Sequence, residues 1–486
     1  MKILVAASEA FPFCKTGGLG DVVGALSQTF SRIDEHEVVL FLPRYRSAGQ
    51  GAFSFKAVPG NFLIPVGGAI ETASIAMVHW GKITVYFIEN SKYFDRPGIY
   101  RSNFGDYEDN DERFVFFSRA VLEGAKFIGF KPDVIHCHDW QTAIIPAYLK
   151  TLYRIDSFYV KTAVVFTIHN IAYQGMFPKE TLLKAGFTWV DFTPDRLEFY
   201  GGINFMKAGI VFSDAVTTVS PSYAEEIKLK AEFGRGLEGI LKYRSADLYG
   251  IINGIDDEIW DPASDTVIRR GYDAKSFLKG KSSCKKSLQH ECGLPENKDM
   301  PLAGVVSRLD VQKGLDLIAG IIPEFVDKIQ FVILGSGDSS IAESFSALSK
   351  NFPACVFFKS GFDETLAHKI YAGSDVFLMP SRFEPCGLSQ MIAMRYGSLP
   401  VVTRTGGLKD TVRYDGEPKD SNGFAIDAPT YTGMHSVLGH IVSLFKYREL
   451  WNAMVKNAMS GAYSWSKSAE EYLKLFAATI QKKSNL

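Results

Sequence analysis

The sequence KTGGLGDV occupies residues 15–22, between an apolar run and a helical pattern. The run KILVAA at residues 2–7 is typical of a buried strand, and residues 22–30 carry apolar side chains at helical spacing. Glycines let the backbone approach a ligand closely, and the free N–H groups at a helix start favour an anion. With the Lys15 ammonium beside them, they predict a phosphate cradle. A helix-capping turn next to a surface lysine is the alternative interpretation.

The spacing of the glycines excludes two common phosphate-binding motifs. The glycines stand at positions 17, 18, 20 and 24. This spacing matches neither the P-loop pattern GxxxxGK[ST] nor the dinucleotide pattern GxGxxG. The stretch therefore favours neither a nucleotide hydrolase nor a nicotinamide-dependent enzyme.

Length, charge and cysteine usage restrict the class of protein. A chain of 486 residues is expected to form two or three domains, and its net charge of −1 provides no electrostatic footprint for nucleic acid or an anionic membrane. The six cysteines form no C-x-x-C pair, which favours reduced thiols. No apolar run is long enough to span a membrane. We expect a soluble intracellular protein, cytoplasmic in a bacterium or plastidic if a transit peptide was removed.

Two series of alternating strands and helices follow one another along the chain. Apolar strands are expected at 38–43, 133–137, 163–168 and 215–219, and then at 302–307, 330–334, 356–359, 375–379 and 399–402. Residues 53–94 are expected to form an inserted hairpin region, and residues 261–298 show no clear pattern. The sequence predicts an α/β protein with two doubly wound Rossmann-like domains facing a central cleft. The expected domains are 1–248 and 249–465, and a C-terminal helix in 466–486 could pack back on the first domain.

Three expected strand ends in the second half carry polar or glycine-rich loops. The sequences are SRLDVQKG at 307–314, PSRFEPCGL at 380–388 and TGGL at 405–408. Arg308 and Lys313 can hold a diphosphate, and Glu384 beside a helix start can accept sugar hydroxyls. A pair of surface cations is the alternative for Arg308 and Lys313. Because strand ends meet at one edge of a parallel sheet, the three loops predict a ligand site.

Two strand ends in the first half carry matching polar groups. The sequences are HCHDW at 136–140 and HNIAYQG at 169–175. Histidines, an aspartate and aromatic rings suit a ligand with many hydroxyl groups. A His-x-His-Asp zinc site is an alternative, although no third ligand stands at motif spacing. The sequence DND at 109–111 also resembles a metal motif, but a helix N-cap with an acidic first turn explains it better.

Taken together, these motifs resemble those of bacterial glycogen synthases and plant starch synthases. The resemblance rests on KTGGL at 15–19, HNIAYQG at 169–175, Arg308 with Lys313, and EPCGL at 384–388, and it extends from Met1 to about Tyr463. It implies a retaining glycosyltransferase of the GT-B type that transfers glucose from ADP-glucose to an α-1,4-glucan. The chain departs from many relatives at Gln141, where a histidine is common, and at Phe362, where a tyrosine is common.

The resemblance also implies roles for individual residues. Catalysis and phosphate binding fall to Lys15, His169, Arg308, Lys313 and Glu384. Donor binding falls to Gly17, Gly18, Asn253, Phe362, Cys386, Gly387 and Leu388, with Phe362 stacking on the adenine. Contact with glucose or the acceptor falls to Tyr100, Asp139 and Asn170. No metal and no cofactor are expected, because fixed cations would stabilise the leaving phosphate.

Other functions stay open from the sequence. A related transferase with another donor or acceptor, such as sucrose, trehalose phosphate or a lipid, is the nearest alternative. A non-catalytic glucan-binding relative is a second one, although such a module need not keep a full set of phosphate-binding cations. A phosphorylase is disfavoured, since no lysine site for pyridoxal phosphate is evident.

Overall fold

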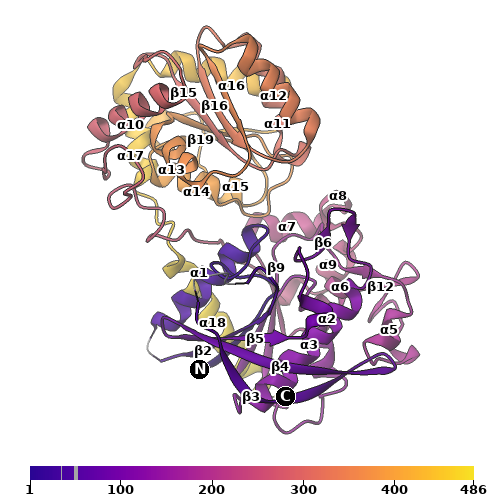
Figure 1. Cartoon of the computed structure of the whole chain (residues 1–486). Coiled ribbons are helices and arrows are strands. Elements are labelled where there is room, and N and C mark those ends of the chain that lie inside the picture. Colours follow the sequence, from indigo (N-terminus) through magenta and orange to yellow (C-terminus); the bar gives the residue numbers. More distant parts are fainter. Residues whose placement is uncertain (34, 49–52, 486) are drawn as a thin grey trace. The chain divides into compact units, whose positions relative to one another are not determined.

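The computed structural model describes residues 1–33, 35–48 and 53–485, and it divides into two α/β units. Unit 1 comprises Met1–Asn253 together with Trp465–Leu486, and unit 2 comprises Gly254–Ser464. The chain thus passes from unit 1 into unit 2 and returns (Figure 1). Both units are built around parallel sheets with helices on their faces, so the predicted fold class is confirmed.

The main sheet of unit 1 has nine strands in the order β14-β13-β9-β8-β1-β2-β5-β4-β3. The strands are β1 (Lys2–Ala6), β2 (Glu37–Pro43), β3 (Lys56–Val66), β4 (Ala69–Trp80), β5 (Ile83–Glu89), β8 (Val134–His138), β9 (Ala163–Ile168), β13 (Ala215–Thr218) and β14 (Leu248–Gly250). Strands β14 to β5 are parallel, and β4 and β3 continue the sheet antiparallel. The expected hairpin at 53–94 is present, but its last strand, β5, pairs with β2 and belongs to the main sheet.

Ten helices accompany this sheet within the described residues of unit 1. They are α1 (Gly18–Arg32), α2 (Ser91–Phe94), α3 (Asn110–Phe127), α4 (Ile144–Lys150), α5 (Thr181–Lys184), α6 (Phe205–Phe212), α7 (Pro221–Leu229), α8 (Ala231–Gly234), α9 (Glu238–Tyr243) and α18 (Trp465–Ser484). Two small antiparallel sheets are formed by β6 (Arg101–Ser102) with β7 (Gly105–Asp106), and by β10 (Met176–Phe177), β12 (Gly202–Asn204) and β11 (Glu198–Phe199).

The C-terminal helix α18 packs on α1 in unit 1 (Figure 1). The Phe30 ring of α1 lies 6.2 Å from the Tyr472 ring and 5.5 Å from the Phe476 ring, and all three side chains are fully buried. The Ser468 hydroxyl also donates a hydrogen bond to the Ile252 carbonyl. Burying aromatic rings of this size stabilises the contact by about 2 kcal/mol for each side chain, so the returning helix is an integral part of unit 1.

Unit 2 contains a six-stranded parallel sheet in the order β17-β16-β15-β18-β19-β20. Its strands are β15 (Leu302–Val306), β16 (Gln330–Gly335), β17 (Val356–Ser360), β18 (Val376–Met379), β19 (Leu399–Thr403) and β20 (Phe424–Ile426). Its helices are α10 (Phe277–Glu291), α11 (Leu315–Ile321), α12 (Ser339–Asn351), α13 (Glu364–Gly373), α14 (Ser389–Arg395), α15 (Gly406–Thr411), α16 (Tyr431–Leu444) and α17 (Arg448–Met459). The strand order reverses between β15 and β18, which makes the carboxyl ends of these two strands the expected ligand site of this unit.

Helix α10 corrects the expectation that residues 261–298 lack a regular pattern. One position on the buried face of this helix is a lysine, which interrupts the apolar pattern. Lys285 is 6% exposed, and its Nζ binds Asp375 at 2.7 Å and the Met300 carbonyl at 2.6 Å. Leu288 and Cys284 are buried beside it. Because the sequence pattern counts a lysine as a surface residue, an interior lysine conceals the buried face of the helix.

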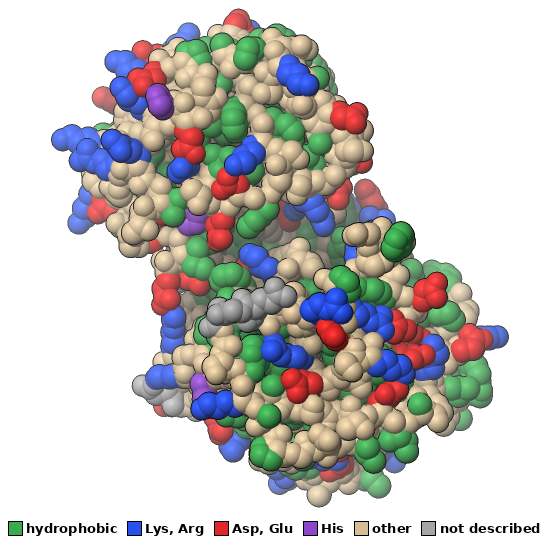
Figure 2. Space-filling model, viewed as in Figure 1, with side chains coloured by type: hydrophobic (Ala, Val, Ile, Leu, Met, Phe, Trp, Pro, Cys, Tyr) green, Lys and Arg blue, Asp and Glu red, His purple; other side chains and the backbone are tan. Residues whose placement is uncertain are grey.

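The surface agrees with the near-zero net charge. Side chains of both signs are interspersed on the face of each unit that Figure 2 shows. In the described part of the chain, no helix has the length and apolar character needed to span a bilayer.

Candidate active site

In the KTGGLGDV stretch, residues 15–17 form an exposed turn ahead of α1, and residues 18–22 are the start of that helix, where Gly20 and Val22 are buried. Gly17 holds the N-cap position of α1 and supplies no side-chain cap, so the first N–H groups of the helix lack that partner. Space is open around Gly17 and Gly18, where an added Cβ would meet no atom within 4 Å. The Lys15 ammonium lies 2.9 Å from Asp21 and 5.0 Å from the Phe11 ring centroid. The turn therefore offers a cation and the amides of a helix start without a side-chain cap to an anionic ligand.

A buried carboxylate, missed by the sequence analysis, holds this turn in place. Glu9 is 2% exposed and accepts hydrogen bonds from the backbone N–H and the hydroxyl of Thr16, the latter at 2.9 Å. It also accepts a bond of 2.5 Å from the Tyr100 hydroxyl, which lies 2.7 Å from Ser8 Oγ. Burial, and after it the nearby Glu9 carboxylate, raise the pKa of Tyr100 well above its ordinary value. The position of Glu9, just beyond β1, was the available signal.

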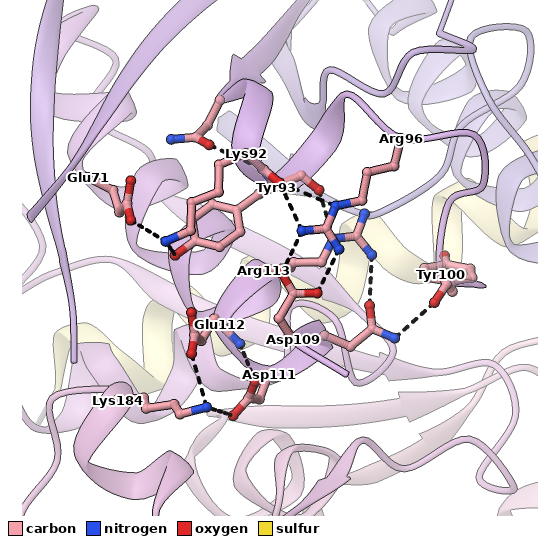
Figure 3. Close-up of polar contacts among 12 residues, drawn as sticks. Glu71, Lys92, Tyr93, Arg96, Tyr100, Asp109, Asp111, Glu112, Arg113 and Lys184 are labelled. Atoms are coloured by element: carbon pink, nitrogen blue, oxygen red, sulfur yellow. Dashed lines mark hydrogen bonds and ion pairs between the residues drawn. The ribbon is translucent and has the colours of Figure 1, made fainter. Parts of the chain in front are cut away.

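The backbone of Tyr100 is fixed by a polar network around the start of α3 (Figure 3). Asn110 Nδ2 donates to the Tyr100 carbonyl at 2.9 Å, and Arg113 Nη1 donates to Asn110 Oδ1 at 2.7 Å. The expected N-cap at Asp109 is in the right position, but its carboxylate makes no cap bond and binds Arg96 instead, with two contacts of 2.6 Å. Burial raises the pKa of Asp109, and Arg96 outweighs it and leaves this pKa below its ordinary value.

The ends of β8 and β9 bring Asp139 and His169 together. Asp139 has a left-handed backbone with φ of 54°, and its carboxylate accepts a 2.7 Å hydrogen bond from the His169 backbone N–H. Burial raises the pKa of Asp139 to about 7 and lowers the pKa of His169 to about 3. His169 Nε2 lies 2.9 Å from Nδ1 of the fully buried His138. Burial also lowers the pKa of His138 well below its ordinary value, so both imidazoles are uncharged at neutral pH, whereas Asp139 is close to its titration point.

The predicted site residue Asn170 follows His169 and is half-buried. Its Oδ1 accepts a 3.0 Å hydrogen bond from the Ala172 N–H, which stabilises the turn that follows β9. Gln141 is buried, and its Oε1 has no hydrogen-bond partner in the part of the chain that the structure describes.

Acid is expected to destabilise unit 1 through His136, which is fully buried. Its Nε2 lies 2.7 Å from Thr167 Oγ1, and burial lowers its pKa to about 3. The imidazole of the unfolded chain has a pKa of about 6.5. Between pH 6.5 and 3 the unfolded chain therefore binds a proton at His136, whereas the folded chain does not. The stability conferred by the neutral ring is complete above pH 6.5 and is lost as the pH falls.

We therefore expect His136→Gln to reduce the acid sensitivity of unit 1. Between pH 7.5 and 5.5 the wild-type free energy of unfolding loses about 1.4 kcal/mol through this one imidazole, and the variant avoids that loss. Guanidinium chloride denaturation at both pH values measures the difference, and the opposing contribution of Asp139 cancels because both proteins contain it. Replacement of the exposed His290 is the matched control. An unchanged pH dependence in His136→Gln would contradict the assignment.

The central contact of unit 2 joins the loops that follow β15 and β18. Lys313 Nζ lies 2.6 Å from Glu384 Oε2, and Ser381 Oγ donates to the same oxygen at 3.2 Å. The Glu384 side chain is 7% exposed, whereas the Lys313 side chain is 23% exposed. The carboxylate is thus paired on one side, and the ammonium keeps access to a ligand. These two predicted site residues lie together as an ion pair at the switch point of the sheet.

The backbone beneath this pair is closely packed. Gly314 has φ of 70°, and a Cβ on it would lie 2.2 Å from the Pro380 carbonyl oxygen. Only glycine permits both this conformation and this approach. Gln312 also bonds to the loop, with Nε2 donating to the Phe383 carbonyl at 3.0 Å. The two loops therefore form one rigid support for Lys313 and Glu384.

The remaining predicted residues of unit 2 differ in their surroundings. Cys386 is buried, and Gly387, with φ of 74°, lies close to the start of α14. Leu388 holds the N-cap position of α14. Arg308 is exposed and 3.7 Å from Asp310, and Phe362 is 81% exposed. Arg308 and Phe362 thus expose a cation and an aromatic ring at strand ends, and neither touches the Lys313–Glu384 pair in a described contact.

Asn253 is the last residue of unit 1 before the chain enters unit 2. It is 5% exposed, and its Oδ1 has no hydrogen-bond partner among the described residues.

The zinc alternative receives no support from the side chains that the structure describes, since no three His, Cys, Asp or Glu residues are grouped to hold a metal ion.

Comparison with known proteins identifies the family. A model described as starch synthase catalytic domain matches residues 2–243, and one described as glycosyl transferases group 1 matches residues 290–460. A glycogen synthase of Elusimicrobium minutum is 52% identical over 99% of this chain and 100% of its own length. The chain belongs to the glycogen and starch synthase family.

Further relatives agree with this assignment. A glycogen synthase of Geobacillus thermodenitrificans is 43% identical over 99% of this chain and 98% of its own. The catalytic domain of starch synthase IV from Arabidopsis thaliana, solved with ADP and acarbose, superposes with a TM-score of 0.90 at 35% identity and covers 99% of each chain. Sucrose-phosphate synthase from Thermosynechococcus elongatus, at 17% identity and a TM-score of 0.61, shares the fold.

These findings confirm the predicted family, the GT-B fold and a role in glycogen or starch synthesis. The protein is a glycosyltransferase with a nucleotide-sugar donor and a glucan acceptor.

Proposed function

We propose that this enzyme transfers glucose from ADP-glucose to the non-reducing end of an α-1,4-glucan with retention of configuration. The observation that supports it best is the Lys313–Glu384 pair, in which a buried carboxylate and an accessible ammonium stand 2.6 Å apart at the switch point of unit 2. The starch synthase solved with ADP supports adenine as the base of the donor. The exposed Phe362 ring is available to stack on it.

The proposed chemistry breaks the bond between the anomeric carbon and the diphosphate oxygen. A bond forms between that carbon and the acceptor O4, and the acceptor proton passes to the departing phosphate. Negative charge grows on the phosphate, so Lys313, Arg308 and Lys15 would stabilise it together with the amides at the start of α1.

Unit 1 would stabilise the sugar as positive charge develops on it. Burial keeps His169 uncharged at neutral pH, because its pKa is lowered to about 3. A neutral imidazole can bond to the glucosyl group without repelling an oxocarbenium-like carbon. Asp139 and Asn170 are proposed to bind hydroxyls of the glucose or of the acceptor end. No covalent enzyme intermediate is needed, since the leaving phosphate itself accepts the proton.

The donor assignment is tested by measuring nucleotide release. The enzyme is incubated with glycogen and either ADP-glucose or UDP-glucose, in buffer that contains EDTA, and ADP or UDP is quantified. We expect ADP release to be at least about tenfold faster, equivalent to about 1.4 kcal/mol of discrimination, and EDTA to have no effect. Faster UDP release would reassign the donor. Absence of release from both donors would favour a glucan-binding relative or another acceptor.

A further inference from the structure

Three non-glycine residues in the described part of the chain have a positive φ, and two of them lie outside the site described above. They are Asp139 at 54°, Tyr200 at 48° and Arg235 at 53°. A bulky side chain in this conformation strains the backbone and persists where the surroundings enforce it, frequently at functional sites. Asp139 belongs to the candidate active site, so Tyr200 and Arg235 call for an explanation of their own.

Tyr200 and Arg235 are neighbours although 35 positions separate them. Tyr200 forms the turn between β11 and β12, and Arg235 caps the end of α8. A methyl group on Gly236 would lie 3.4 Å from the Tyr200 ring and 3.1 Å from the Phe199 ring. The turn and the helix end therefore pack against each other, within unit 1.

Both segments are tied to the loop that follows His169. Gln174 is buried, and its Nε2 donates to the Arg235 carbonyl at 3.1 Å. Its Oε1 accepts a 2.7 Å hydrogen bond from Asn204, the last residue of β12. Phe205 N also donates to the Gly175 carbonyl at 3.0 Å. One buried amide thus joins the strained turn and the strained helix cap to the loop that carries His169 and Asn170.

Packing within the chain does not account for the side chains at these positions. The Tyr200 side chain is 85% exposed, and Arg235 is exposed without an ion pair among the described residues. Glycine would adopt the same φ at lower cost, and Gly201 follows directly. The Tyr200 ring and the Arg235 guanidinium are thus exposed on a strained and well-anchored backbone, and burial of these side chains does little to offset the strain.

We propose that Tyr200 and Arg235 bind the α-glucan acceptor at glucose units beyond the reacting end. The apolar face of a glucose ring can stack on the tyrosine, and the five N–H donors of the arginine suit sugar hydroxyls. The loop at 169–175, to which both segments are tied, exposes Tyr173 (53%), and β10, which follows it, exposes Met176 (64%). This inference rests on the proposed function, because it assigns a second contact to the same acceptor chain.

The test measures glucan binding without catalysis. Native gel electrophoresis of the full chain in gels that contain glycogen, with no donor present, gives an apparent dissociation constant. We expect Tyr200→Ala and Arg235→Ala each to weaken it about three- to tenfold, and Tyr200→Phe to stay near wild type. Rates with maltose are expected to change less than rates with glycogen. Tyr447→Ala, which removes another exposed tyrosine from unit 2, is the matched control.

A purely structural role predicts the opposite pattern. Tyr200→Gly relieves the strained backbone, so we expect its thermal unfolding midpoint to equal or exceed that of wild type while glycogen binding weakens. An unfolding midpoint that falls, with glycogen binding within twofold of wild type, would overturn the proposal. Failure of the proposed function would look different: wild type would then bind glycogen without releasing nucleotide, or would not bind it at all.

Discussion

Replacing Lys313 by alanine is expected to lower kcat about a hundred- to a thousandfold, the loss typical of one preorganised charge donor. The ammonium is the part of the unit 2 pair that a ligand can reach, since its side chain is 23% exposed against 7% for Glu384. The ammonium would stabilise the phosphate as its bond to the sugar breaks, when the negative charge on the phosphate is greatest. The KM for the donor is expected to change less than kcat, because the contact strengthens in the transition state. Initial rates of ADP release over a range of ADP-glucose concentrations measure both constants.

A structural explanation for such a loss can be separated by a second variant. Removing Lys313 leaves the Glu384 carboxylate buried and unpaired except for Ser381, which costs stability as well as activity. In Lys313→Ala/Glu384→Gln the buried charge is gone, so the unfolding midpoint should recover while kcat stays low. Recovery of kcat in the double variant would show that Lys313 only neutralises Glu384.

Arg382→Ala is the matched control for both variants. Arg382 lies in the same loop as Glu384 but binds Asp316 through two contacts of 2.7 Å. Its removal deletes a cation from the same loop and leaves both side chains of the Lys313–Glu384 pair in place. It also breaks the 2.5 Å hydrogen bond from Arg382 Nη1 to the Val311 carbonyl, in the turn that carries Lys313. We expect kcat to remain within a fewfold of wild type, and a loss as large as that of Lys313→Ala would mean that any disturbance of this loop abolishes activity.

The sequence predicted the strands of unit 2 well because they are continuous apolar runs. The expected strand at 330–334 corresponds to Gln330–Gly335, and the expected strand at 399–402 to Leu399–Thr403. Strand β20 was not predicted, since three residues are too few to show a pattern. Helix α10 was missed for a different reason, namely that Lys285 occupies an interior position where the pattern requires an apolar residue.

The site residues that the sequence predicted are those that follow closely after an apolar strand. Lys313 and Glu384 both stand just beyond expected strands, and the parallel topology brings them to 2.6 Å. Glu9 also follows a strand closely, but its partners Thr16 and Tyr100 come from a turn and from a segment 91 positions away, so the sequence did not show what this carboxylate binds. The positive φ of Tyr200 likewise could not be predicted from the sequence, since a tyrosine beside a glycine is ordinary in a turn.

Gly406→Ala is expected to reduce kcat at least about a hundredfold, because displacing a catalytic group by about 1 Å can cost that much. Gly406 opens α15 with φ of 43°, and a Cβ on it would lie 2.0 Å from the carbonyl oxygen of Glu384. The methyl group must push the Glu384 backbone away, and the carboxylate moves with it. The variant thus disturbs Glu384 without changing any charge or hydrogen-bonding side chain in the site.

Gly439→Ala provides the comparison that isolates this effect. Gly439 lies within α16, where an added Cβ meets no atom within 4 Å, so alanine should stabilise the helix by about 1 kcal/mol and leave kcat unchanged. Gly406→Ala should lower the thermal unfolding midpoint as well as kcat, since it combines a disfavoured φ with a backbone clash. Near-normal turnover in Gly406→Ala would mean that the Glu384 loop tolerates displacement, and the position of that carboxylate would then not control the reaction.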